Sequence, residues 1–141
     1  MTIIAGGCLC GAVRYEAELA PQFAVLCHCR DCQRISGSGH VPVMGVPKSS
    51  FIVRGATKAY AARGGSGRAA VRHFCHVCGS LLFGTAEIVP DIVSIYVGSL
   101  DDPSVFQPDT VLFARDRHAW DVTVGSFAEY ETMPAPPATH N

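Results

Sequence analysis

Hydrophobic residues in this chain gather in short runs, which either alternate with polar residues or are rich in branched and aromatic side chains, and both patterns favour strands. The segment 12–18, Ala-Val-Arg-Tyr-Glu-Ala-Glu, shows this alternation most clearly. The expected strands cover residues 12–18, 23–26, 41–46, 51–54, 58–62, 71–74, 81–83, 92–97 and 111–114. Gly and Pro, which favour turns, separate most of these runs. The pattern therefore predicts a mainly β domain.

Helical periodicity is scarce. One or two helical turns are expected around residues 30–35, where the break Ser36-Gly37-Ser38-Gly39 ends them, and another turn near 102–105. The glycine-rich segment 63–68 is typical of a hairpin loop between two strands. The Pro- and Ala-rich segment 134–141 buries little apolar surface, so we expect one domain over 1–133 followed by a loose tail.

The composition fits a single compact domain, with 141 residues, of which 48% are hydrophobic and 16% charged. Eleven Lys and Arg against twelve Asp and Glu give a net charge of −1, which provides no basic footprint for nucleic acid. The sequence lacks a run of about 18 apolar residues, so no membrane span is expected. The first eight residues lack the basic and hydrophobic segments of a signal peptide, and a cytoplasmic location is therefore predicted.

Seven cysteines form three tight clusters, and the spacing predicts metal binding. The clusters are Cys8 and Cys10, then Cys27, Cys29 and Cys32, then Cys75 and Cys78. Disulfides are the competing use of cysteine, but an odd count leaves one thiol over and the cytoplasm keeps thiols reduced. A closed structural zinc site takes four ligands and a catalytic site usually takes three, so four plus three accounts for all seven.

Two of the clusters have the form of half-sites for one ion. Cys8 and Cys10 point to the same face if the backbone is extended, because side chains in a strand repeat every two residues. Cys75 and Cys78 fit a tight turn around a metal, and Gly79 permits the close backbone approach that such a turn needs. Together they would make a closed four-thiolate centre whose binding free energy contributes to folding.

The cluster at 27–32 offers three thiolates and no obvious fourth ligand. His28 and His40 are candidates to close this site, and His73 and His76 flank the other one. Because the cysteines already account for both sites, surface placement or a supporting hydrogen bond is the simpler role for each histidine.

Spacing alone leaves other partitions open. Cys-x-x-Cys at 29–32 and 75–78 would make a zinc ribbon, leaving Cys8, Cys10 and Cys27 over, although ribbon knuckles are usually much closer in sequence. A thioredoxin-like redox role for either motif is weaker, because that motif belongs beside a βαβ pattern that this sequence lacks.

The segments 6–15, 27–38 and 74–80 together resemble the glutathione-dependent formaldehyde-activating enzyme family, which also contains the centromere protein V domain. The segment 97–103 and the region around Trp120 fit the same family. The resemblance extends over about residues 3–133 and implies an Mss4-like zinc-binding β fold of short antiparallel strands with little helix. One departure is that Val-Leu-Phe at 111–113 stands where many relatives carry a His before the apolar pair.

The resemblance also implies which cysteines share a metal and what they do. It assigns a structural zinc to Cys8, Cys10, Cys75 and Cys78, and a second, catalytic zinc to Cys27, Cys29 and Cys32. The implied activity is that of a carbon–sulfur lyase, in which glutathione sulfur adds to formaldehyde to give S-(hydroxymethyl)glutathione, and the reverse cleavage. The alternative is a non-catalytic, zinc-stabilised binding module with two structural sites.

An anionic thiol such as glutathione requires cationic groups near the reacting centre. Arg30 and Arg34 flank the three-cysteine cluster and are the candidate substrate-binding residues, while Arg72 and His73 precede the other cluster. Trp120 is expected in the core or, less favoured, at the edge of a pocket.

Overall fold

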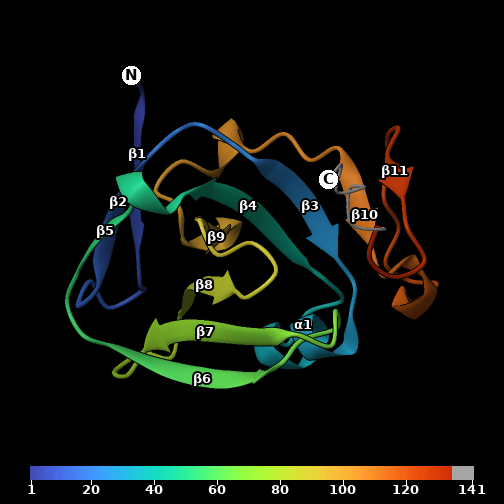
Figure 1. Ribbon diagram of the computed structural model, residues 1–141, viewed down its shortest axis with the longest axis horizontal. Helices are drawn as coiled ribbons and strands as arrows, with labels where there is room; N and C mark the ends of the chain where they lie inside the picture. The colour runs from blue at the N-terminus through green and yellow to red at the C-terminus, as the bar shows by residue number, and fades with distance from the viewer. Residues whose placement is uncertain (135–141) are drawn as a thin grey trace, which may run out of the picture.

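The computed structural model describes residues 1–134, and strands are the main regular elements of this part of the chain (Figure 1). The strands are β1 (Ile3–Gly7), β2 (Arg14–Glu18), β3 (Phe23–Cys27), β4 (Val41–Pro47), β5 (Ile52–Arg54), β6 (Thr57–Arg63), β7 (Ala69–Cys75), β8 (Leu81–Ala86), β9 (Ile92–Tyr96), β10 (Thr110–Leu112) and β11 (Ala128–Glu129). The predicted mainly β fold with little helix is confirmed. The tail predicted from residue 134 falls, from residue 135 onward, outside the described residues.

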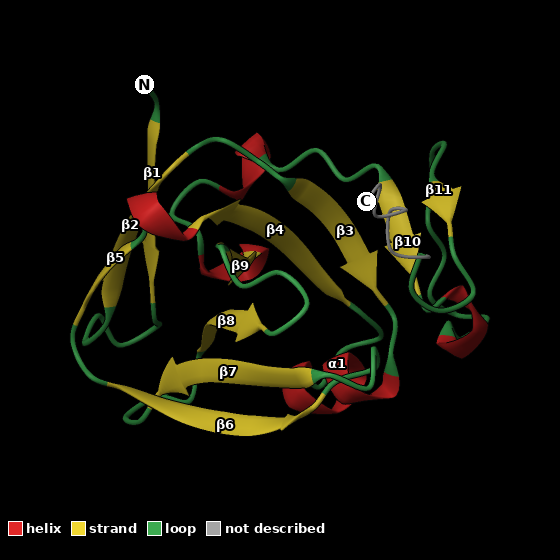
Figure 2. Ribbon diagram, in the orientation of Figure 1, coloured by secondary structure: helices red, strands yellow, loops and turns green. Residues whose placement is uncertain are grey.

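The strands form two sheets. A small antiparallel sheet has the order β1-β2-β5, and a large one has the order β11-β10-β3-β4-β9-β8-β7-β6. Figure 2 shows the small sheet at one end of the molecule and β10 and β11 at the other. The large sheet is antiparallel from β3 to β6, but β10 pairs in parallel with both β3 and β11. The antiparallel strands that were expected make up the rest of both sheets, and this edge adds parallel pairs because the long connection after β9 returns the chain in the direction of β3.

The main core lies between the small sheet and the centre of the large one. Ile4 and Tyr15 from the small sheet pack with Met44, Leu82 and Ile95, and all five side chains are buried. Burial of these large apolar side chains is the dominant stabilising term of such a fold. A second cluster of buried residues lies around the ends of β3 and β4 and contains three of the cysteines.

Most predicted elements are present with small shifts at their ends. The helix α1 covers Arg30–Ser36 and ends at Gly37, whose φ of 70° is the left-handed conformation that glycine adopts readily. A short 3-10 turn covers Pro103–Val105, and the segment 63–68 connects β6 and β7 as a hairpin. Strands β1 and β11 were not predicted. Among the described residues, no helix is long and apolar enough to cross a membrane.

Candidate metal centres

Four cysteines from two distant turns converge at one point. Cys8 and Cys10 lie in the turn between β1 and β2, and Cys75 and Cys78 lie at the turn between β7 and β8. Their sulfur atoms all lie within 4.8 Å of one another. The Cys10 Sγ atom is 3.6 Å from that of Cys8 and 3.7 Å from that of Cys75. Sulfurs arranged tetrahedrally around zinc lie about 3.8 Å apart, so this set has the spacing of a four-thiolate site.

Each of the two turns is closed by a glycine N–H that donates to the carbonyl of the first cysteine, three residues earlier in one turn and four in the other. The N–H of Gly11 donates to the Cys8 carbonyl, and the N–H of Gly79 donates to the Cys75 carbonyl. Both glycines have positive φ, 84° and 76°, which bends the backbone around the thiols. The expectation that Cys8 and Cys10 converge from an extended strand is wrong, because the chain turns at Gly11 and β2 begins only at Arg14. The role predicted for Gly79 agrees with its conformation.

Backbone and hydroxyl donors surround these sulfurs. The Val13 N–H lies 3.2 Å from the Cys8 Sγ atom. The side-chain hydroxyl and backbone N–H of Ser80 lower the pKa of Cys78 to about 5. Hydrogen bonds of this kind favour the thiolate, which is the form that binds metal.

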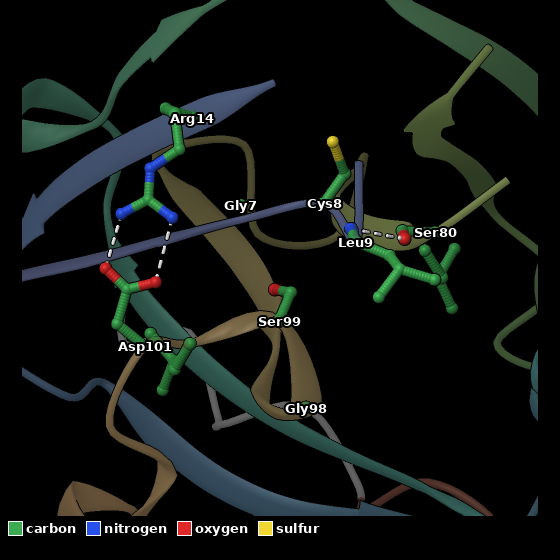
Figure 3. A pocket seen from close by; sticks show the side chains of 10 residues that line it. Gly7, Cys8, Leu9, Arg14, Ser80, Gly98, Ser99 and Asp101 are labelled. Atoms are coloured by element: carbon green, nitrogen blue, oxygen red, sulfur yellow. Dashed lines mark hydrogen bonds and ion pairs between the residues drawn. The ribbon is translucent and has the colours of Figure 1, made fainter. Parts of the chain in front are cut away.

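An open depression of about 420 Å³ lies next to this four-cysteine cluster. Figure 3 shows the ion pair between Arg14 and Asp101 on one side and, on the other, the Leu9 N–H donating to the Ser80 hydroxyl. The Arg14 charge is thus already neutralised by a partner. None of the three cysteines at 27–32 and neither candidate substrate arginine lines this depression, so it is not the predicted reaction site.

The other three cysteines come from consecutive parts of the chain. Cys27 is the last residue of β3, Cys29 is the N-cap of α1, and Cys32 lies in the first turn of that helix. Their sulfurs lie within 4.8 Å of one another. The exposed fractions of the three residues are only 9%, 6% and 6%. The structure therefore brings the predicted trio together in a largely buried position.

The trio favours one ionised thiol. Hydrogen bonds from Cys27 and Cys32 lower the pKa of Cys29 to about 2, against an opposing effect of burial. The backbone N–H of Cys32, 3.3 Å from the Cys29 sulfur, acts in the same direction. The same contacts raise the pKa of Cys27, because it donates to its neighbours. These hydrogen bonds thus favour the thiolate at Cys29.

Arg72 supplies a positive charge to this cluster. Sequence distance associated Arg72 with Cys75, but its guanidinium group interacts with Cys32 and Cys29 instead. Burial works to lower the pKa of Arg72, yet its interactions with Tyr96, Cys32 and Cys29 raise it overall. The Arg72 Nε atom is buried and has no hydrogen-bond partner within residues 1–134. This arginine is therefore a site residue that proximity in sequence assigned to the wrong cluster.

The predicted substrate arginines lie on the exposed side of α1. Arg30 donates to the Gln33 side-chain oxygen, and Arg34 is exposed. Gln33 itself is buried, and its amide donates to the carbonyls of His28, at 2.7 Å, and Asp116, at 3.0 Å. Gln33, which the sequence did not indicate, thus ties the helix to the segment after β10.

Phe113 covers the three-cysteine cluster from a strained backbone conformation. It is buried against this cluster together with Tyr96, and its φ of 56° is the only positive φ of a non-glycine residue in the described part of the chain. Bulky side chains rarely adopt this conformation, which marks positions held by surrounding structure. A Cβ atom on Gly65, in the β6–β7 hairpin, would lie 2.6 Å from the Phe113 ring. The hairpin therefore packs directly on this aromatic cover.

His28 and His40 do not close the three-cysteine site. They gather with Asp121 in a separate group whose ligand atoms lie within 4.8 Å of one another. His28 is fully buried, and burial is the main cause that lowers its pKa. Neither ring nitrogen of His28 makes a hydrogen bond to a described residue. Asp121 had no signal in the sequence, because it lies far along the chain from both histidines.

The remaining histidine candidates and Trp120 belong to none of these ligand groups. His73 stacks on Phe83, with ring centroids 4.6 Å apart, and its Nδ1 atom is 2.9 Å from the Thr57 hydroxyl. His76 is exposed. The prediction of a core position for Trp120 is wrong, because 71% of this residue is exposed and its ring stacks on His118.

Comparison with known proteins is in line with this geometry. Residues 3–116 match the family described as glutathione-dependent formaldehyde-activating enzyme. A Halomonas elongata protein with the provisional name glutathione-dependent formaldehyde-activating enzyme is 27% identical over 124 residues, covering 84% of this chain and 79% of the relative. A crystal structure of a Rhodobacter sphaeroides protein matches with a TM-score of 0.55 and 29% identity, over 69% of this chain and 87% of that one. The chain therefore belongs to the glutathione-dependent formaldehyde-activating enzyme family.

Proposed function

We propose that this protein is a zinc-dependent enzyme of the carbon–sulfur lyase type that acts on a small thiol adduct. The specific reaction we propose is the formation and cleavage of S-(hydroxymethyl)glutathione. In the forward direction a bond forms between the thiol sulfur and the carbon of formaldehyde, and the thiol proton ends on the carbonyl oxygen. The observation that carries the proposal is the trio Cys27, Cys29 and Cys32, which offers three sulfurs to one ion and leaves a fourth position free.

The donor sets fit zinc. All seven cysteines are free thiols, as the cytoplasmic location that we propose for the protein would maintain. The four-cysteine cluster has tetrahedral spacing, which supports a closed structural site. The trio has no fourth protein ligand among the described residues, which supports an open one. A zinc ion bound there would supply Lewis acidity that keeps a coordinating substrate thiol ionised.

The surrounding residues would position the substrate. Cys29 and its two partners hold negative charge, and the buried guanidinium of Arg72 compensates part of it. Phe113 and Tyr96 form an apolar wall that limits water near the reacting sulfur. Arg30 and Arg34, exposed on α1, are the groups that we propose to bind the carboxylates of a tripeptide thiol.

Exchange NMR with glutathione and formaldehyde tests this proposal. We expect the protein to accelerate exchange between the free thiol and its hydroxymethyl adduct, and Cys29→Ser to reduce that acceleration roughly 100-fold or more. Serine is a preferred N-cap residue, so this variant retains the cap of α1 and is expected to fold. If wild-type protein leaves the exchange rate at its uncatalysed value, the proposed reaction is wrong.

One observation favours the alternative, a non-catalytic module with two structural sites. The three cysteines are as little exposed as other buried residues of the protein, and Phe113 packs in the same cluster. Cobalt-substituted protein distinguishes the two functions. An open site responds to a small added thiol with a change in the cobalt–thiolate absorption bands, whereas two closed sites leave these bands unchanged at every thiol concentration.

A further inference from the structure

Beyond the two thiol clusters, we propose that His28, His40 and Asp121 form a third metal site, which binds a divalent transition ion such as Zn²⁺, Fe²⁺ or Co²⁺. This site takes nitrogen and oxygen ligands only. It does not depend on the proposed lyase function, because it shares no ligand atom with either cysteine cluster.

The ligand atoms face a common point. The Asp121 Oδ2 atom lies 2.7 Å from the Nδ1 atom of His40 and 3.3 Å from the Nδ1 atom of His28. The two imidazole rings are neighbours, with centroids 4.8 Å apart. Ligands bound at about 2.1 Å lie about 3.0 to 3.4 Å apart around an ion. The contact with His28 already has this spacing, and the shorter one requires His40, which is partly exposed, to move by about half an ångström.

The backbone around His28 directs its ring away from the thiols. Side chains of an extended chain alternate, so Cys27 and Cys29 point to one side and the residue between them to the other. The groupings agree, because the two cysteines converge with Cys32 while His28 converges with Asp121.

His28 also presents an unsatisfied polar group. Its side chain is completely buried, yet neither ring nitrogen makes a hydrogen bond among residues 1–134, since the 3.3 Å contact of Nδ1 with Asp121 lacks the geometry of one. Leaving such a group unpaired costs about 1–3 kcal/mol, so buried polar atoms are nearly always satisfied. A bound metal ion would satisfy the Nδ1 atom and explain why a histidine occupies this position.

The turn before β4 is shaped to admit the carboxylate. Gly39 lies in this turn, and a Cβ atom there would collide with the Asp121 carboxylate and lie 2.8 Å from the Trp120 ring. Only a residue without a side chain lets Asp121 approach His40 from this side. Trp120, the one tryptophan of the sequence, thus lies next to the proposed ion.

The chemistry of the donors defines the class of ion. Two imidazoles and one carboxylate suit zinc and the divalent ions of iron, cobalt and nickel. The thiolates of the two cysteine clusters favour softer metal ions. Three protein ligands leave further coordination positions open. The site therefore has the ligand set of a centre that also binds water or an oxygen-containing ligand.

Quenching of Trp120 fluorescence by Co²⁺ tests the proposal. Protein pre-equilibrated with two equivalents of Zn²⁺ is titrated with Co²⁺, and emission and absorption are recorded together. We expect saturable quenching with one equivalent of Co²⁺ and no cobalt–thiolate absorption. His40→Gln and Asp121→Asn should each raise the half-quenching concentration at least about tenfold. His76→Gln, which removes an exposed histidine elsewhere, should leave it unchanged.

The outcomes separate this site from the thiol sites. Unsaturable quenching, or equal quenching in wild type, His40→Gln and Asp121→Asn, overturns the third site. In a further outcome, cobalt–thiolate bands appear and the quenching still depends on His40. This result would show that Co²⁺ has replaced zinc at the thiol sites, and it would still support the third site. Because His40 is partly exposed, its variant is expected to fold, and circular dichroism checks this.

Discussion

The four-cysteine cluster joins two turns that are far apart in the sequence, whereas the three-cysteine cluster lies within six consecutive residues. Cys10 and Cys75, whose sulfurs are 3.7 Å apart, are separated by 65 positions. The trio connects only the end of β3 with the start of α1. Exposure differs as well, since Cys10 is exposed while every member of the trio is buried.

The difference in sequence separation means that metal binding would restrict the chain to different extents at the two cysteine clusters. A metal that closes a long loop offsets a large loss of chain entropy, so its binding contributes strongly to folding. A metal bound within a short segment closes only a short loop, so it offsets a smaller loss of chain entropy. Arg72 and Phe113, which come from β7 and from the segment after β10, converge on the trio and shape its surroundings. This contrast supports the proposal that the long-range site stabilises the fold and that the local one carries the chemistry.

The largest expected effect is on stability. Cys10→Ser removes an exposed ligand with little change in packing, and we expect it to lower the free energy of unfolding by about 3 kcal/mol or more. The melting temperature should fall by about 10 °C. Cys29→Ser, which retains the N-cap of α1, should lower it much less. Thermal unfolding of the zinc-loaded variants measures both, and equal losses would remove the distinction between the sites.

A smaller effect is expected where the hairpin covers the trio. A Cβ atom at Gly65 meets the Phe113 ring, so we expect Gly65→Ala to lower the free energy of unfolding by about 1–2 kcal/mol relative to Gly64→Ala. Gly64→Ala is the matched control, because its Cβ makes an ordinary 3.5 Å contact with Ala70. Urea denaturation gives the difference. The packing described for Phe113 would be wrong if the two variants were equally stable.

The smallest expected effect concerns charge at the trio. Arg72→Met retains much of the side-chain volume but removes the positive charge, and we expect the three-cysteine site to bind Co²⁺ about tenfold more weakly, or about 1.4 kcal/mol. Competition with a chelator, followed through the cobalt–thiolate bands, measures this. Arg34→Met removes an exposed charge on α1 and should change the affinity less than twofold, about 0.4 kcal/mol. A similar loss in both variants would show that Arg72 has no particular role.

Local pattern predicted most of the fold. Apolar alternation and short runs of branched and aromatic residues located nine of the strands, and the Ser-Gly break located the end of α1, because these signals depend on near neighbours. The strand Ile3–Gly7 was missed because two glycines weaken its β pattern. Parallel pairing of β10 with β3 depends on where a long connection runs, which no local signal encodes.

The thiol groups were predictable and their surroundings were not. Cysteine spacing carries information about metal ligands, and the family resemblance resolved the partition that spacing left open. Arg72 was assigned by sequence distance, yet three residues of strand span about 10 Å, enough to bring it to a different cluster from Cys75. Asp121 meets His28 and His40 only through the tertiary fold. Contacts of this kind depend on topology rather than on spacing.

The connectivity of the two cysteine clusters also imposes an order on assembly during synthesis. The trio is complete once residue 32 has left the ribosome, so its three thiols can meet while most of the sheet is still unmade. Cys8 and Cys10 must wait for residue 78, and until then their thiols lack the other half of the site. The N-terminal turn is thus the segment that depends most on a reducing environment between translation and folding.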